Sequence, residues 1–195
     1  MMNLSSIRVG LAVCLVVLCG CRSGLPPPRY ETLAKQRPRD TARAQRLNAE
    51  GLEHIANEDY AAAERAFRAA LEADLLYPAA HNNICVCLLH DQRWYEAAWE
   101  CQFGAKLAPQ AVEPRANLAL IYEHVGQLDK AEDLCRQALE IDPHSIEVMG
   151  HLARVQVKAN KKDETLRELL QELAFRGDGS DWDVWARRQL VMWRD

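Results

Sequence analysis

The sequence predicts an all-α fold in which pairs of helices stack along the chain. Two amphipathic helical patterns fill residues 112–145, with Gly126 between them and Asp142-Pro143 after the second. The same apolar and small-residue spacing recurs at one period, and the recurring segments are 44–77, 78–111 and 146–177. Because one helix pair alone buries too little apolar surface to be stable, the repetition predicts an α-solenoid with one shared core.

The segment 112–145 resembles a tetratricopeptide repeat, a helix-turn-helix unit of about 34 residues that stacks on its own copies. The family's signature residues are present as Leu118-Ala119, Tyr122, Ala131, Cys135 in the aromatic position, Ala138 and Pro143. The resemblance implies a domain over 41–177 with about three and a half repeats, because the segment 146–177 departs from the pattern after Leu152-Ala153. Small residues at signature positions allow neighbouring helices to approach closely, and these are Gly51, Ala63, Ala70, Ala97, Ala119, Ala131 and Ala138.

A tryptophan-rich segment, 178–195, follows the repeats. Ser180 and Asp183 have the spacing of a capping box at the start of a helix. One face of that helix would carry Trp182, Trp185, Ala186, Leu190 and Trp193. Because tryptophan side chains need a surface that buries them, we expect a helix that caps the last repeat. A docking face for a partner and a membrane-surface helix are the alternatives.

Composition limits the class of function. The chain of 195 residues is 49% hydrophobic and 27% charged, with a formal net charge of −4. These values fit one globular domain with a sizeable core, and they give no basic face for nucleic acid. The sequence contains no glycine-rich phosphate loop and no nucleophile elbow. We therefore expect a protein without catalytic residues or cofactor, that is, not an enzyme.

Residues 1–20 are typical of a lipoprotein signal peptide. Arg8 precedes an apolar run over 9–18, which is too short to span a bilayer as a helix. Gly20-Cys21 at its end is similar to a bacterial lipobox, which implies that Cys21 is lipidated and becomes the mature N-terminus. Ordinary secretory cleavage, an uncleaved anchor and a cytosolic chain are the alternatives.

Residues 21–40 are rich in proline and arginine, and we expect them to be an extended tether. The positive charge of this tether suits anionic lipid headgroups, and a solvated spacer without lipid contact is the alternative. The lipid would hold the domain in a bacterial cell envelope. Because Arg22 rather than an aspartate follows Cys21, the resemblance implies the periplasmic face of the outer membrane if the cell is Gram-negative.

The repeat resemblance also implies a binding groove on the concave face, lined by the first helix of each repeat. Its apolar middle suits an amphipathic segment of a protein or peptide partner. The alternatives for its asparagine and apolar side chains are bonds between adjacent helices and internal packing. We expect Leu120, Glu123 and His124 to be exposed there. The predicted groove residues are Asn48, Leu52, Ile55, Asn82, Val86, Leu89, His90, Ala116, Asn117, Leu120, Glu123, His124 and Arg154.

Two histidines suggest an alternative function. His90 and His124 share one register position in successive repeats, and Cys87 lies three residues before His90. A metal-binding or enzyme-associated envelope protein using these three side chains is therefore the alternative. No fixed ligand spacing accompanies them, so we predict no metal site.

Four cysteines, Cys85, Cys87, Cys101 and Cys135, follow the N-terminal segment in a chain expected to reach an oxidising compartment. Cys85 and Cys101 belong to helices of one repeat that pack together, so a disulfide between them is geometrically feasible. Buried free thiols are the alternative.

These observations predict a non-catalytic, lipid-anchored envelope scaffold that binds a protein or peptide partner in its groove. The chain is similar to pilotin-type and pilus-assembly lipoproteins, and to repeat lipoproteins that recruit cell-wall hydrolases. The resemblance implies a role in assembling a pilus, secretion or cell-wall complex. It also implies membrane contact through the lipid and no contact with nucleic acid.

Overall fold

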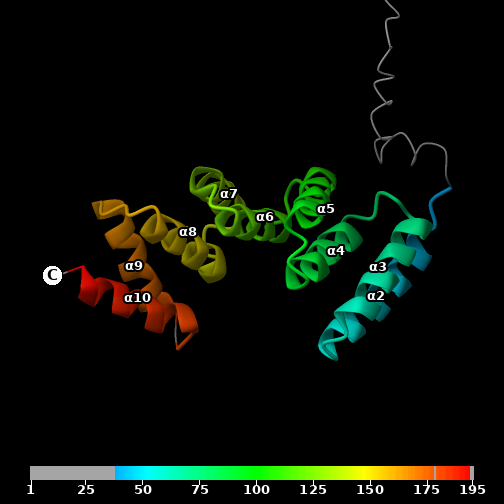
Figure 1. Cartoon of the computed structure of the whole chain (residues 1–195), viewed down its shortest axis with the longest axis horizontal. Coiled ribbons are helices and arrows are strands. Elements are labelled where there is room, and N and C mark those ends of the chain that lie inside the picture. The colour runs from blue at the N-terminus through cyan, green and yellow to red at the C-terminus, as the bar shows by residue number, and fades with distance from the viewer. Residues whose placement is uncertain (1–37, 178, 194–195) are drawn as a thin grey trace, which may run out of the picture.

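The computed structural model describes residues 38–177 and 179–193, and this part of the chain consists of α-helices without any strand (Figure 1). The helices form consecutive pairs that follow one another in an arc, which confirms the predicted all-α solenoid. The predicted signal peptide, Cys21 and nearly all of the tether lie outside the described residues. The four pairs are α2 (Thr41–Ala56) with α3 (Tyr60–Ala73), α4 (Pro78–His90) with α5 (Trp94–Leu107), α6 (Glu113–His124) with α7 (Leu128–Ile141), and α8 (Ile146–Lys158) with α9 (Glu164–Arg176). A single helix, α10 (Asp181–Met192), follows the fourth pair.

Local capping chemistry sets where several helices begin. The side chains of Asp40, Asp59 and Asp163 each accept a hydrogen bond from a backbone N–H in the first turn of α2, α3 and α9. Proline occupies the first turn of α4 and α6, where its missing N–H costs nothing. Ser180 accepts a hydrogen bond from the N–H of Asp183, so the predicted cap of the last helix is confirmed.

The turns inside the four pairs share one geometry. Glu58, Gln92, Gly126 and Asn160 stand one repeat length apart, and each has a positive φ between 55° and 76°. In each turn the N–H of the next residue bonds to the carbonyl five residues before it, at 2.8 to 3.0 Å. This left-handed closure of a helix favours glycine, because a Cβ crowds the backbone there. Only one of the four turns has glycine at this position.

We expect the substitution Gly126→Ala to lower the free energy of unfolding by about 1 kcal/mol, because the alanine Cβ is strained in the left-handed region. The added carbon would touch nothing within 4 Å, so backbone strain is the whole cost. The reverse change in a sister turn, Gln92→Gly, removes the same strain and should not destabilise. Urea denaturation followed by circular dichroism measures both variants, and equal losses would contradict this account of the turn.

The shared core lies between the two helices of each pair and between adjacent pairs. The small residues predicted to allow close helix approach are all buried, and they are Gly51, Ala63, Ala70, Ala97, Ala119, Ala131 and Ala138. Gly51 illustrates the reason, since a Cβ on it would lie 2.3 Å from the ring of Phe67. The close contact between α2 and α3 therefore depends on the absence of a side chain at this position.

Helix α10 closes the array against α8 and α9. Ala186 is fully buried, and Trp182, Trp185, Leu190 and Trp193 pack half-buried against a cluster of residues from these two helices. The tryptophan face is thus used inside the chain, as expected for a capping helix. No helix in residues 38–177 and 179–193 combines the length and apolar character needed to cross a bilayer.

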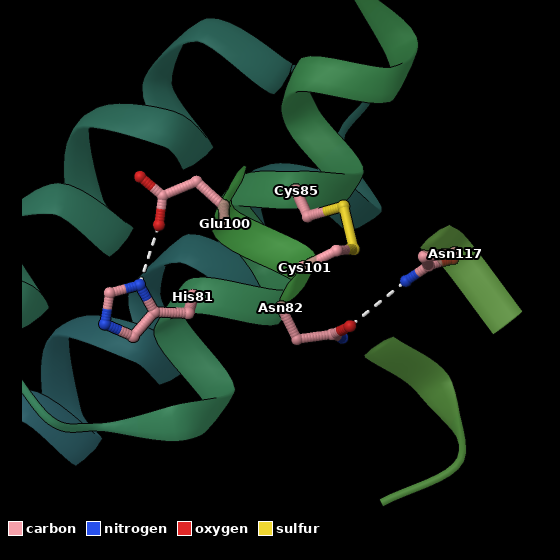
Figure 2. Close-up of a disulfide and its surroundings, with 6 residues drawn as sticks. All are labelled: His81, Asn82, Cys85, Glu100, Cys101 and Asn117. Atoms are coloured by element: carbon pink, nitrogen blue, oxygen red, sulfur yellow. Dashed lines mark hydrogen bonds and ion pairs between the residues drawn. A yellow bond between two sulfur atoms is a disulfide. The ribbon is translucent and has the colours of Figure 1, made fainter. Parts of the chain in front are cut away.

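A disulfide joins the helices of the second pair. Cys85 on α4 and Cys101 on α5 are bonded through their Sγ atoms, and both residues are fully buried (Figure 2). Of the two alternatives for these cysteines, the structure has the bridge rather than free thiols. Cys87 and Cys135 are free, and burial raises the pKa of each thiol to about 12, so neither carries a reactive thiolate.

Removing this bridge should lower the free energy of unfolding by about 3 kcal/mol, because it closes a loop between residues 16 positions apart. The unfolding midpoint of the wild type in dithiothreitol should therefore approach that of the double variant Cys85→Ala/Cys101→Ala. The reductant should not change the midpoint of the double variant, which serves as the control. A wild-type midpoint that is the same with and without dithiothreitol would contradict the predicted contribution of the disulfide to stability.

Candidate binding groove

Hydrogen bonds between neighbouring first helices place the predicted groove residues on one face. Asn83 on α4 donates to Asn48 on α2 at 2.9 Å. Asn117 on α6 likewise donates to Asn82 on α4 at 3.1 Å, the bond that Figure 2 shows. The asparagines therefore join adjacent helices, which was the alternative interpretation of their role. Asn48 is also only 7% exposed, so little of it is accessible from the groove.

The apolar groove residues divide into an accessible group and a packed group. Leu52 is 48% exposed, and Val86 and Leu120 are half-buried outside the core clusters. Ile55 and Leu89 instead pack against the buried cluster of the first two pairs. Ala116 also departs from the expected surface position, because it is buried in the next cluster. The accessible stripe therefore consists of Leu52, Val86 and Leu120, one residue from each of α2, α4 and α6.

A pocket of about 570 Å³ lies at the N-terminal ends of α4 and α6, and its lining residue Asn82 is one helical turn before Val86 of the stripe. Its volume is in the range of pockets that hold small ligands or single anchor side chains. Asn82 and Asn83 form the border shared with the groove, and Glu113 contributes the charged group of the lining. The remaining lining residues are Tyr77, Pro78, Ala79, Ala108, Ala111 and Pro114. Sequence reasoning missed this pocket, which arises where two loops meet.

Glu123 is not exposed as expected, because basic residues from the next repeat cover it. Only 6% of the residue is exposed, and its carboxylate accepts hydrogen bonds from Arg154 at 2.9 and 2.7 Å. The ammonium of Lys158 lies 2.6 Å from the same carboxylate. Burial alone would raise the pKa of Glu123, but the bonds from Arg154 and Lys158 outweigh burial and lower it. These three groups therefore join α6 to α8, and the carboxylate of Glu123 is not accessible to a ligand.

The indole of Trp182 packs on α8 beside the predicted groove residue Arg154. Its ring lies 5.2 Å from the ring of His151 and 5.2 Å from the guanidinium carbon of Arg154. Gly150 lies beneath the indole, since a Cβ there would be 2.2 Å from a ring carbon of Trp182. Trp182 thus covers Arg154 of the fourth pair, and the accessible apolar residues of the predicted groove lie on α2, α4 and α6.

His90 and His124 are each stacked on an aromatic ring of the preceding pair. The ring centroid of His90 lies 3.7 Å from that of Tyr60, and that of His124 lies 4.4 Å from that of Trp94. Cys87 is fully buried in the core and does not join them. Among the described residues, no group of three His, Cys, Asp or Glu side chains is arranged to hold a metal ion. The three side chains suggested as a metal or acid-base cluster are therefore not brought together.

A curved array of helix pairs with accessible apolar residues along its first helices defines the class of helical-repeat proteins. Residues 48–101 and residues 113–145 each match a family profile described as tetratricopeptide repeat. These two matches support the tetratricopeptide repeat family for this chain. Domains of this family generally mediate binding of proteins or peptides.

Similar solved structures agree with the fold. The first tetratricopeptide domain of Spaghetti (RPAP3), bound to the HSP90 peptide SRMEEVD, has a TM-score of 0.61 and 16% identity, covering 63% of this chain and 98% of that one. MamA of Desulfovibrio magneticus has a TM-score of 0.62 and 20% identity, covering 78% and 84%. The O-GlcNAc transferase of Thermobaculum terrenum has a TM-score of 0.67 and 20% identity, covering 72% and 27%. At these identities the likeness concerns the fold alone.

Curated relatives are longer proteins. Sperm-associated antigen 1 of mouse is 28% identical over 134 residues, which are 69% of this chain and 14% of that protein. Anaphase-promoting complex subunit 3 of Schizosaccharomyces pombe is 27% identical over 129 residues, covering 66% and 19%. The chain therefore spans less than a fifth of the length of either relative.

Proposed function

We propose that the protein is a non-catalytic, lipid-anchored scaffold of the bacterial envelope that holds an amphipathic segment of a protein partner in its groove. One observation carries the binding proposal, namely the accessible stripe of Leu52, Val86 and Leu120 beside the pocket of about 570 Å³. An apolar stripe next to a concave pocket suits apolar side chains along one face of a bound segment. The partner would belong to a pilus, secretion or cell-wall complex, as the sequence resemblance implies.

The charges of the groove favour an apolar partner segment over an acidic one. The peptides held by two similar structures, SRMEEVD of HSP90 and SGPTIEEVD of HSP70, contain several acidic residues. In this chain Arg154 and Lys158 already bond to Glu123, and the indole of Trp182 covers Arg154. The basic groups that an acidic peptide would need are thus engaged within the protein.

The open groove also limits the length of the bound segment. Neighbouring packed helices lie about 8–10 Å apart, so the distance from α2 to α6 is about 16–20 Å. A segment of about six residues in extended conformation, or about twelve in a helix, spans that distance. A short element of the partner therefore suffices to cover the stripe.

Charge placed in the stripe should weaken partner binding without unfolding the protein. We expect the double variant Leu52→Glu/Leu120→Glu to lose at least about tenfold in affinity, because each buried apolar contact is replaced by a carboxylate that must be desolvated. Photo-crosslinking from position 86 in intact envelopes identifies the partner by mass spectrometry, and titration with that partner measures the affinity. Leu89 is unsuitable for this test, since it packs against the core.

The matched control for this experiment is Val184→Glu, which places a carboxylate on an exposed valine of α10 outside the groove. Its affinity should equal that of the wild type. Wild-type affinity in the groove variant, with an unchanged melting temperature, would refute binding at the stripe.

The proposal of a lipid anchor depends on the lipobox-like residues Gly20-Cys21. Metabolic labelling with a palmitate analogue should label the wild type and not the variant Cys21→Ser, which should also leave the membrane fraction. Absence of label in the wild type, or label that survives in Cys21→Ser, would refute the anchor while leaving the groove proposal intact.

A further inference from the structure

Two exposed aromatic residues project from α5, a helix that contributes none of the groove residues. Tyr95 is 90% exposed and Trp99 is 54% exposed, and they lie one helical turn apart. Neither belongs to the buried clusters of the core. We call these two residues the α5 ridge. Large aromatic side chains contribute most when a surface covers them, so an uncovered pair on one helix indicates an interaction site.

A hollow lies on each side of the α5 ridge. The first, of about 290 Å³, lies between α5 and the C-terminal end of α6 with the turn that follows it, where Trp94, Ile121, Tyr122 and Val125 line it together with the ridge. The second, also about 290 Å³, lies between α5 and the preceding helices. The first hollow is mainly aromatic and aliphatic, and its volume lies near the lower limit of small-ligand pockets. It therefore suits one or two apolar side chains.

The two hollows carry different charges at their borders. Lys130 is the charged residue of the first hollow. The second is bordered by Glu96, Arg68 and Glu100. Of these, Glu100 is buried and Arg68 pairs with Glu64. Glu96 has the most exposed side chain, at 58%, and its carboxylate accepts hydrogen bonds from Arg93 at 2.9 and 2.6 Å. The α5 ridge is thus flanked by a cation on one side and an accessible carboxylate on the other.

We propose that the α5 ridge binds a second copy of this chain through a two-fold symmetric contact. A two-fold contact uses the same surface of both copies, so a ridge beside a hollow is complementary to itself. The ridge of each copy enters the first hollow of the other. This arrangement brings Lys130 of one copy next to Glu96 of the other, and the symmetry makes that pair twice.

The contact leaves the accessible stripe of α2, α4 and α6 free in both copies, because neither the ridge nor the lining of the first hollow includes Leu52, Val86 or Leu120. The dimer would present two grooves. A partner that carries two copies of its segment would bind with an effective concentration set by the distance between the grooves, which raises its overall affinity.

Sedimentation equilibrium of the full chain in detergent tests the proposal. The wild type should sediment as a dimer at micromolar concentration. The double variant Tyr95→Ala/Trp99→Ala should raise the dissociation constant at least about tenfold, because it removes the aromatic anchors of both copies. Its melting temperature at low concentration should not fall, since these side chains are exposed. The matched control is Phe175→Ala, which removes an aromatic side chain of 88% exposure from α9 and should leave the mass unchanged.

A charge exchange tests the symmetry. Lys130→Glu and Glu96→Lys should each weaken the dimer severalfold, since each places like charges opposite one another. The double variant Lys130→Glu/Glu96→Lys should restore it, because the opposite charges meet again with their positions exchanged. A photo-crosslinker at position 99 should link to residues 94–130 of another copy of the chain.

Three results would overturn the proposal. They are a wild type that is monomeric at every concentration, a dimer that persists in the aromatic double variant, and crosslinks from position 99 that reach only other proteins. Each of these results would leave the groove proposal unaffected, because its variants lie on different helices.

Discussion

Deleting residues 180–195 should unfold the fourth helix pair and lower the free energy of unfolding by about 5 kcal/mol or more. The deletion exposes the cluster of Met149, Ala153, Leu166, Leu170 and Leu173, which α10 covers. Each large apolar side chain that loses its burial costs about 1.5–3 kcal/mol. In a helical-repeat array such a loss at the end acts first on the neighbouring repeat. Amide hydrogen exchange should therefore show lost protection in α8 and α9 while α2 to α5 remain protected.

Two single substitutions distinguish the contribution of the tryptophan face to stability from that of the exposed side of α10. Trp182→Ala removes the half-buried indole above Gly150 and should cost about 3 kcal/mol. Val191→Ala, on the exposed side of the same helix, should change stability by less than about 0.5 kcal/mol. A soluble deletion variant with wild-type stability would contradict the capping role of α10.

Replacing both Arg154 and Lys158 by alanine should lower the free energy of unfolding by about 3–5 kcal/mol. The side chain of Glu123 is only 3% exposed, and the double substitution leaves its charge buried without a cation. Adding Glu123→Gln to the double variant should recover part of the loss, because the unpaired charge is gone. As a control, Arg167→Ala removes an exposed pair with Glu164 at 3.5 Å and should cost less than about 1 kcal/mol.

The pH dependence follows from the direction of the same pKa shift. Because the folded state lowers the pKa of Glu123 below its usual value of 4.5, the unfolded state binds a proton first as pH falls. The stabilisation from its ion pairs is therefore complete above about pH 4.5 and is lost as pH falls through the lower pKa of the folded state. Denaturation midpoints measured across this range should depend less on pH in Glu123→Gln than in the wild type. Equal dependence in both proteins would contradict the prediction.

Most of the fold could be predicted because its determinants recur along the chain. Small residues such as Gly51 and Ala131 occupy corresponding places in successive repeats, and close helix packing needs them there. Among the four turns, only Gly126 indicated the left-handed turn geometry in the sequence. Glu58, Gln92 and Asn160 adopt the same left-handed conformation, but their residue types do not predict it as glycine does. The common repeat spacing was the signal that could have identified them.

The groove could be predicted only by position, because accessibility depends on which side chains from other helices cover each residue. Leu52 and Leu89 occupy comparable faces of first helices, yet one is exposed and the other packs against the core. Glu123 is buried because its partners lie one repeat later, at Arg154 and Lys158. The pocket beside Asn82 depends on two loops whose paths the helical pattern does not specify. Hydrophobic periodicity carries no information on such long-range contacts.

The contacts between successive helix pairs differ in how strongly they depend on ionised carboxylates. The first three pairs are joined by asparagine hydrogen bonds, by the ring stacks of His90 and His124, and by one ion pair between Arg93 and Glu64 at 3.0 Å. The third and fourth pairs are joined by two buried glutamates, Glu123 and Glu132. Burial raises the pKa of Glu132, but bonds from Lys161 and its other partners outweigh burial and lower it to about 2. Because two buried carboxylates join the third and fourth pairs, we expect acid to weaken that contact more than the contacts between α2, α4 and α6, which carry the accessible stripe.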